Sequence, residues 1–295
     1  MSSSTSSTSS TDSHLQPAKA SQCETDLIVS ALNNPQHIQK IVSEAIILGG
    51  GAAAILLQVA HPGVAKGVNY HSSFATRPVD RLRTTMTYVY SMLFGTPAEK
   101  KKIIELVHRA HAPVRGADYE ADDPSAQLWV AATLYAVGVD LYESIFGELD
   151  EETAEQAYRE YVVLGASLRV PVEMWPKDRE AFWIYWDEQL ATFDICDEAK
   201  NVAHDLLYNP KIPFYFRALM PTLRLVTAEL LPERLRKEYG LKSSKGRRRL
   251  YKSTMAITKA TYPFLPRAIR TYPVKFYMKD MRKRMKKYGE AQRKI

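Results

Sequence analysis

Histidines are the side chains in this sequence best suited to chemistry, and four of the seven lie between His61 and His111. In the segment 97–116, Ile104, Val107 and His111 recur at spacings of three and four, which places them on one helical face. His111 is therefore expected to point into the core, and His108 toward a flank that can meet solvent. A histidine on an apolar face is commonly a hydrogen-bonded core residue, but a neutral imidazole in an apolar pocket also suits an axial haem ligand.

A polar stripe forms a second candidate site on the preceding predicted helix. Arg81, Thr85 and Tyr88 follow one another at spacings of four and three. In one interpretation Arg81 pairs with a carboxylate and Thr85 bonds back to the carbonyl of Arg81. In the other, the guanidinium and the hydroxyl face a pocket, where they hold a propionate or polarise bound dioxygen.

His61 and His71 are supporting candidates. Pro62 is expected to end an apolar helix just after His61, and His61 to cap that end by donating to a free carbonyl. A haem-free alternative uses His61, His71 or His108 for acid–base catalysis. The sequence contains no G-x-G-x-x-G or Walker loop, no G-x-S-x-G elbow, and no H-E-x-x-H or paired C-x-x-C. These absences argue against a phosphate loop, a serine triad and a zinc site.

Helical patterns predict the elements that position these residues. A capping box opens a helix at Thr96, Asp123-Pro124 starts another, and a third runs from Pro78 to Gly95. Further helices are predicted at 151–164, 178–192, 197–208, 214–231, 245–261 and 274–292. No strand alternation or hairpin signal is present. We expect an all-α fold, a single globular domain of about ten helices around a hydrophobic cofactor pocket.

Charge is divided unevenly along the 295 residues. Residues 233–295 contain 21 Lys and Arg against 4 Asp and Glu, a balance of +17, while the preceding residues balance at −10. We expect the acidic body to hold cofactor and chemistry, and the basic C-terminal extension, about 240–295, to be separable. The extension could be solvated, dock on the body through an apolar stripe, or contact an anionic membrane surface. The acidic body argues against nucleic acid as a partner.

The N-terminal region predicts no targeting or spanning segment. Residues 1–24 read as a disordered Ser/Thr-rich leader and 25–295 as the helical domain, with no signal peptide. The apolar run 45–60 is shorter than the roughly 20 residues of a transmembrane helix and is expected to form one buried helix. Its three glycines, Gly49–Gly51, suggest close helix packing or a bend. An intracellular location, cytoplasmic or peripheral to the ER membrane, is expected.

Several motifs carry a family resemblance when taken together. The order LLQVAHPGVAKGV, HSSF, RPVDRLRTTMTYV, FGT, VHRAHAPVRG and DDPSAQLWVAATL, followed by LLPERLRKEYGL, resembles the mpaB / rubber oxygenase (latex clearing protein) catalytic-domain family. The similarity covers roughly residues 46–250. It implies an all-α protein that binds haem b and cleaves carbon–carbon double bonds of isoprenoid chains with dioxygen. Fungal relatives tailor terpenoids in secondary metabolism.

The resemblance assigns roles to particular residues. His111 matches the proximal haem-iron ligand, and Arg81 and Thr85 match residues on the distal side. Thr84 stands where rubber-cleaving members have a lysine, so control of dioxygen or substrate is expected to differ and rubber itself is not the expected substrate. The resemblance thus implies a haem b-dependent oxygenase acting on a hydrophobic, isoprenoid-like small molecule. The alternatives are a non-catalytic, basic-tailed helical protein that binds a membrane or partner, and a haem-free tailoring enzyme using the same pocket.

Overall fold

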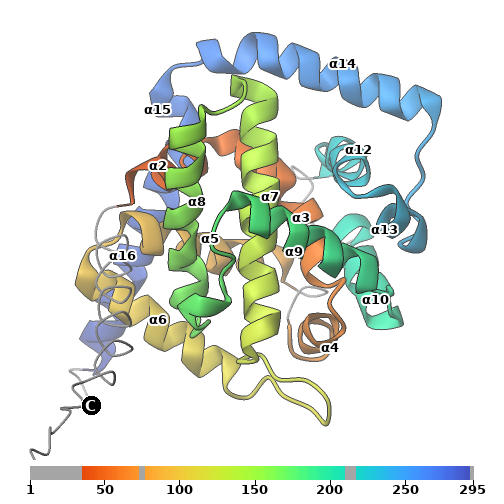
Figure 1. The fold of residues 1–295 in the computed structure, drawn as a ribbon. Helices are drawn as coiled ribbons and strands as arrows, with labels where there is room; N and C mark the ends of the chain where they lie inside the picture. The colour runs from red at the N-terminus through yellow and green to blue at the C-terminus, as the bar shows by residue number, and fades with distance from the viewer. Residues whose placement is uncertain (1–34, 73–76, 210–216, 293–295) are drawn as a thin grey trace, which may run out of the picture.

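Helices pack against one another around a long central helix in the described part of the chain (Figure 1). The computed structural model describes residues 35–72, 77–209 and 217–292, so the predicted leader, residues 1–24, lies outside the described residues. Within these ranges there are fourteen α-helices, three 3-10 helices and no β-strand. The predicted all-α class is confirmed. The number of helices exceeds ten because four of them have eight residues or fewer.

The elements follow one another with short connections. In chain order they are α2 (Gln36–Val42), η1 (Ala45–Gly50), α3 (Gly51–Gln58), α4 (Pro62–His71), α5 (Pro78–Phe94), α6 (Pro97–His111), α7 (Pro124–Phe146), α8 (Glu151–Ala166), η2 (Val172–Met174), α9 (Arg179–Thr192), α10 (Asp197–Tyr208), α12 (Met220–Leu230), α13 (Glu233–Glu238), α14 (Lys245–Thr261), η3 (Tyr262–Phe264), α15 (Arg267–Arg270) and α16 (Tyr272–Gln292).

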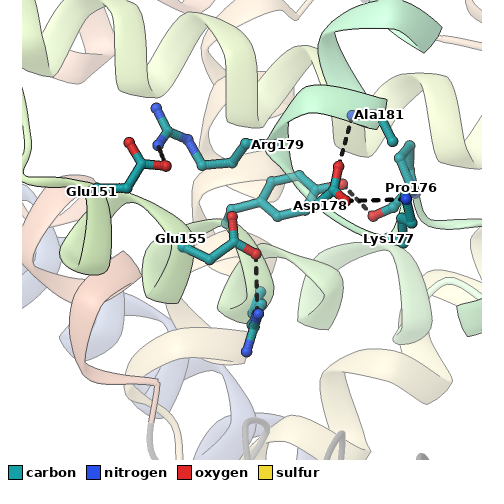
Figure 2. Close-up of polar contacts among 9 residues, drawn as sticks. Glu151, Glu155, Pro176, Lys177, Asp178, Arg179 and Ala181 are labelled. Carbon is teal, nitrogen blue, oxygen red and sulfur yellow. Dashed lines mark hydrogen bonds and ion pairs between the residues drawn. The ribbon is translucent and has the colours of Figure 1, made fainter.

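Side-chain caps define the helix starts that the sequence predicts. Thr96 and Glu99 form the capping box of α6, and the carboxylate of Asp123 accepts from the backbone N–H of Ala126 at 2.7 Å to begin α7. Asp178 caps α9 in the same way (Figure 2). The next residue, Arg179, pairs with Glu151 at 3.1 Å, so the start of α9 is tied to the start of α8.

Helix α7 is the centre of the domain. It runs through the middle of the molecule beside α8, with α14 lying across one end (Figure 1). Helical spacing places four apolar residues on one face, which predicts that this face is buried, and all four are at most 6% exposed: Leu128, Ala132, Tyr135 and Val139. The Tyr135 ring meets those of Tyr158 and Phe182 edge to face, with centroids 5.1 and 4.7 Å apart. This aromatic core fixes how α7, α8 and α9 pack.

The apolar run 45–60 does not form the single helix that we predicted. It is divided into η1 and α3, and the two meet at the glycines. A Cβ atom added at Gly50 would lie only 2.6 Å from Cγ1 of Val137 on α7. Close packing against α7 therefore explains the glycine at position 50, as one of the two interpretations held.

The Gly50→Ala substitution is expected to lower the free energy of unfolding by about 1–3 kcal/mol, because the added methyl overlaps Val137. Denaturant unfolding followed by circular dichroism measures the change. Gly51→Ala is the matched control, since a Cβ there meets nothing within 4 Å. Val137→Ala should restore part of the loss in the Gly50→Ala background. Equal effects of the two glycine substitutions would contradict this account.

Helix α16 belongs to the core, which corrects the expectation that the basic extension is separable. It packs against α5 and buries Met278 and Met281, which are 5% and 1% exposed. On its outer side Arg282 forms two hydrogen bonds to Glu99, at 2.7 and 3.2 Å. Net charge misled the prediction because an apolar stripe at helical spacing docks the helix, while Arg282 pairs with an acidic residue of the body.

A buried carboxylate also joins the two ends of the described chain. Glu44, between α2 and η1, is paired with Arg270 at 2.9 Å and accepts a hydrogen bond from the Tyr262 hydroxyl at 3.0 Å. The same hydroxyl accepts from the backbone N–H of Ile46 at 3.1 Å. Burial raises the pKa of Tyr262 to about 12, so the hydroxyl keeps its proton.

In the described ranges, no single helix has the length and apolar character needed to cross a membrane. By length and composition alone, one pair bent by 68°, Gln36–Val42 with Ala45–Gln58, meets that requirement.

Candidate functional site

His111 is the last residue of α6, where the chain turns into the loop 112–123 that leads to α7. Its ring Nδ1 is 3.1 Å from the side-chain nitrogen of Gln127 and 3.7 Å from Oδ1 of Asp122. The side chain is 29% exposed, so it is half-buried rather than pointing into the core as predicted. The helix also ends five residues before Gly116, the end of the predicted helical segment 97–116, since Pro113 has no N–H to continue it.

The surroundings of His111 favour the neutral imidazole. Burial lowers the pKa of His111 below its ordinary value of 6.5, while the Asp122 carboxylate acts in the opposite direction. The Arg81 guanidinium acts in the same direction as burial and lowers the pKa further. His108 lies one turn before His111 on α6, and Arg81 of α5 is within electrostatic range of the His111 ring. Nε2 of His111 has no hydrogen-bond partner among the described residues.

Asp122 is a site residue that the sequence did not single out. Its Oδ2 is paired with Arg169 at 3.2 Å, while Oδ1 is buried and has no hydrogen-bond partner in the described part of the chain. The nearest donor recorded for Oδ1 is Nδ1 of His111, which is 3.7 Å away. A buried carboxylate oxygen without a donor is costly, so a ring N–H turned toward Asp122 would satisfy it.

The polar stripe on α5 divides into three different roles. Arg81 is largely buried, and this burial lowers the pKa of its guanidinium. Thr84 rather than Thr85 makes the predicted bond back to the helix, donating to the carbonyl of Asp80 at 2.9 Å. Thr85 is exposed and its hydroxyl has no partner among the described residues. Tyr88 is buried and donates to the carbonyl of Leu164 at 2.7 Å, which makes it a structural link to α8.

His108 is half-buried and is tied to the residue that follows α8. Its Nε2 is 3.2 Å from the carbonyl oxygen of Ser167. The Ser167 hydroxyl is in turn 2.7 Å from that of Tyr88. This network joins α5, α6 and α8. Helical phase could not reveal Ser167, because that contact spans 59 residues.

His61 and His71 form a second group on α4. His61 caps the start of α4, where its Nδ1 accepts from the backbone N–H of Val64 at 3.4 Å. The predicted role, donation at the end of the preceding helix, is wrong because the Pro62 that ends one helix begins the next. His71 is exposed, and its Nε2 is 3.0 Å from the Tyr119 hydroxyl.

An open cleft of about 610 Å³ lies beside this second group. It is lined by His61 and by residues of the loop 115–120 and the start of α7, including Tyr119 and Asp123. Burial lowers the pKa of His61, and the Asp123 charge partly offsets that effect. Among the described residues, no three His, Cys, Asp or Glu side chains gather in a way that could hold a metal ion.

Comparison with known proteins supports the family resemblance. The family described as "ER-bound oxygenase mpaB/B'/Rubber oxygenase, catalytic domain" matches residues 39–260. Two relatives are "Uncharacterized protein Rv2237" of Mycobacterium tuberculosis and "Uncharacterized protein Mb2261" of Mycobacterium bovis. Each is 32% identical over 242 residues, covering 78% of this chain and 94% of the relative. No solved structure gives a significant match. The chain belongs to the mpaB/rubber oxygenase catalytic-domain family, a family of oxygenases.

Proposed function

We propose that this protein is a haem b-dependent oxygenase that oxidises a hydrophobic, isoprenoid-like small molecule, with His111 as the axial ligand of the haem iron. One observation carries the proposal: Nε2 of the half-buried His111 has no protein partner among the described residues, while burial, which lowers the pKa of the ring, favours its neutral form. In a family of oxygenases, this is the donor that a haem iron requires on its protein-held side. A cleaved carbon–carbon double bond is the proposed outcome.

The residues around His111 fit that ligand. Iron-bound histidines commonly donate their other ring N–H to a carboxylate or carbonyl, which fixes the tautomer. Oδ1 of Asp122, which is buried without a donor, can accept from Nδ1 of His111 after a small rotation of the ring. The amide of Gln127 then keeps its bond to the carbonyl of Ala121. This arrangement leaves the lone pair on Nε2, where a metal can bind.

The residues of α5 have separate tasks in this proposal. Haem, when bound, supplies the activation of dioxygen. Arg81 remains charged despite its burial and can pair with a propionate or stabilise a developing negative charge. The Thr84 hydroxyl is used by the helix, whereas that of Thr85 is free to donate to dioxygen or a polar group of the substrate. Thr85 is therefore the proposed distal donor.

The absorption spectrum of the purified full-length protein tests the proposal. We expect a Soret band, present on purification or after titration with haem, together with dioxygen uptake in the presence of a short isoprenoid. Protein that does not bind haem would refute it. That result would favour the non-catalytic alternative, in which the helical body binds only a membrane or partner.

Asp122→Asn is expected to weaken haem binding about 10- to 100-fold, because the amide cannot stabilise the Nδ1–H of His111 as a carboxylate does. The loss of charge should also make the Fe(III)/Fe(II) potential more positive. Haem titration and spectroelectrochemistry measure the two effects. Arg169→Gln is the control, since it removes the ion pair of Asp122 but not the carboxylate. An unchanged potential in Asp122→Asn would exclude this positioning role.

The cleft at His61 favours a second candidate function, haem-free acid–base catalysis. Because the Val64 N–H donates to Nδ1, the neutral His61 ring carries its proton on Nε2, from which it can donate a hydrogen bond to a polarised group of a substrate. Turnover by verified haem-free protein in the absence of dioxygen, lost in His61→Gln, would support this function. Activity that requires both haem and dioxygen would exclude it.

A further inference from the structure

A second cleft, of about 590 Å³, lies between α13 and the start of α14, away from all the site residues described above. Figure 1 shows the chain passing from α13 to the end of α14 at the edge of the molecule. The residues of the described chain that line the cleft are mostly basic: Glu233, Arg236, Lys237, Leu241, Lys242, Ser243, Ser244, Arg247 and Arg248.

The positive charges in this cleft are not balanced by the protein. Two carboxylates form ion pairs with three of its five cations. Glu233 is paired with Lys237 at 2.8 Å, and the buried Glu229 is shared between Arg236 at 3.8 Å and Arg248 at 3.9 Å. Lys242 and Arg247 have no carboxylate partner in the described ranges. The sequence offers none nearby, since residues 239–279 contain no Asp or Glu.

Arg247 gives the most direct sign of a missing partner. Its Nε is buried and has no hydrogen-bond partner within the described part of the chain. Buried donors are normally satisfied, and an unsatisfied one commonly marks a bound ion or water. The planar guanidinium suits the oxygens of phosphate groups, which it can hold through two parallel hydrogen bonds.

The start of α14 adds to the same positive field. Ser244 caps the helix by accepting from the backbone N–H of Arg247 at 3.2 Å, and the first turn contains no acidic residue. Most helices place negative charge at this end because the helix dipole is positive there. Here that position faces a basic cleft instead.

The exposed side of α14 indicates what the rest of a ligand could contact. Leu250 and Ile257 are 58% and 64% exposed. Their spacing of seven residues places them on one helical face, beginning one turn beyond the cleft. An apolar chain attached to a phosphate held in the cleft could lie along this face.

We propose that this cleft is a binding site for a phosphate group, carried either by a membrane phospholipid or by a free phosphorylated molecule. Arg247 and Lys242 hold the phosphate oxygens, and Arg248 is shared between the phosphate and Glu229. The site is separate from the haem site, so its occupancy does not depend on the proposed oxygenase activity.

Binding of two probes to the full-length protein tests the site: inorganic pyrophosphate by calorimetry, and vesicles of phosphatidylcholine with or without phosphatidic acid by co-sedimentation. The cleft variant Lys242→Gln/Arg247→Gln is expected to bind the probe that occupies the site about tenfold or more weakly, because it loses charge-assisted hydrogen bonds. Lys252→Gln/Lys259→Gln is the matched control, because it removes two exposed charges from α14 outside the cleft. Lys242→Gln alone, at an exposed residue, repeats the test if the double variant fails to fold.

The pattern of loss distinguishes the two sources. If the wild type and the control variant bind pyrophosphate and the cleft variant does not, the ligand is a free phosphorylated molecule. Binding to phosphatidic acid vesicles alone, with the same variant pattern, supports a phospholipid. The proposal is overturned if the wild-type protein binds neither probe. It is also overturned if the cleft variant binds like the wild type, or if both double variants lose binding equally, since diffuse charge then explains the attraction.

Discussion

The His111→Ala variant is expected to lose the Soret band and all dioxygen-dependent activity. The substitution removes the proposed protein ligand to the iron, and alanine has no donor atom to replace it. Because burial lowers the pKa of His111 below its ordinary value of 6.5, the wild-type ring is expected to remain neutral in mildly acidic buffer. Haem should therefore be retained in mildly acidic buffer by the wild type, as absorption spectra at several pH values will show.

Variants at two other histidines test whether this result is specific to His111. His71→Ala removes an exposed imidazole bonded to Tyr119 and should leave the haem spectrum unchanged. His108→Ala breaks the bond to Ser167 and should lower thermal stability while keeping the Soret band. If His108→Ala loses haem and His111→Ala keeps it, the ligand has been assigned to the wrong residue. Circular dichroism of each variant separates loss of haem from loss of fold.

The second large effect is expected at Met281. Its side chain is 1% exposed between α16 and the body, so Met281→Asp places an unpaired charge in the core. Truncation to alanine alone should cost about 2–5 kcal/mol, and the aspartate should cost more. We expect a fall in the melting temperature of at least ~5 °C for a domain of this size.

The same substitution should also affect the haem site, because α16 packs against the helix that carries Arg81. Lys283→Gln, at an exposed residue of the same helix, is the control and should change neither property. Deleting residues 272–295 should lower the melting temperature and weaken haem binding more than Met281→Asp does. If the truncated protein melts and binds haem like the wild type, the prediction of a separable tail, made from the charge distribution, would be supported.

Local features of the sequence predicted local features of the structure well. The caps at Thr96 and Asp123 act within three residues of themselves, so the starts of their helices follow from the local sequence. Helical phase likewise identified the buried face of α7. It placed His111 near the site but overestimated its burial, because Pro113 ends the helix at the histidine itself.

Long-range contacts could not be predicted in this way. Ser167 meets His108 only because α8 ends beside α6, and nothing in either segment identifies the other. Asp122 could have been noticed in the sequence, because it directly precedes the capping residue Asp123. Its role depends on one oxygen that the fold leaves without a donor, which no sequence pattern records.

The Glu44–Arg270 ion pair has a consequence for how the protein is made. The two residues are separated by 226 positions, and α5 is covered by α16, the last helix of the described chain. Synthesis proceeds from the N-terminus, so α2 and α5 leave the ribosome long before their partners exist. Until then Glu44 has no cation, and the apolar face of α5 has no cover. The nascent chain therefore passes through a state in which this carboxylate is unpaired and this face is exposed, and the domain closes only after its last helix has been made.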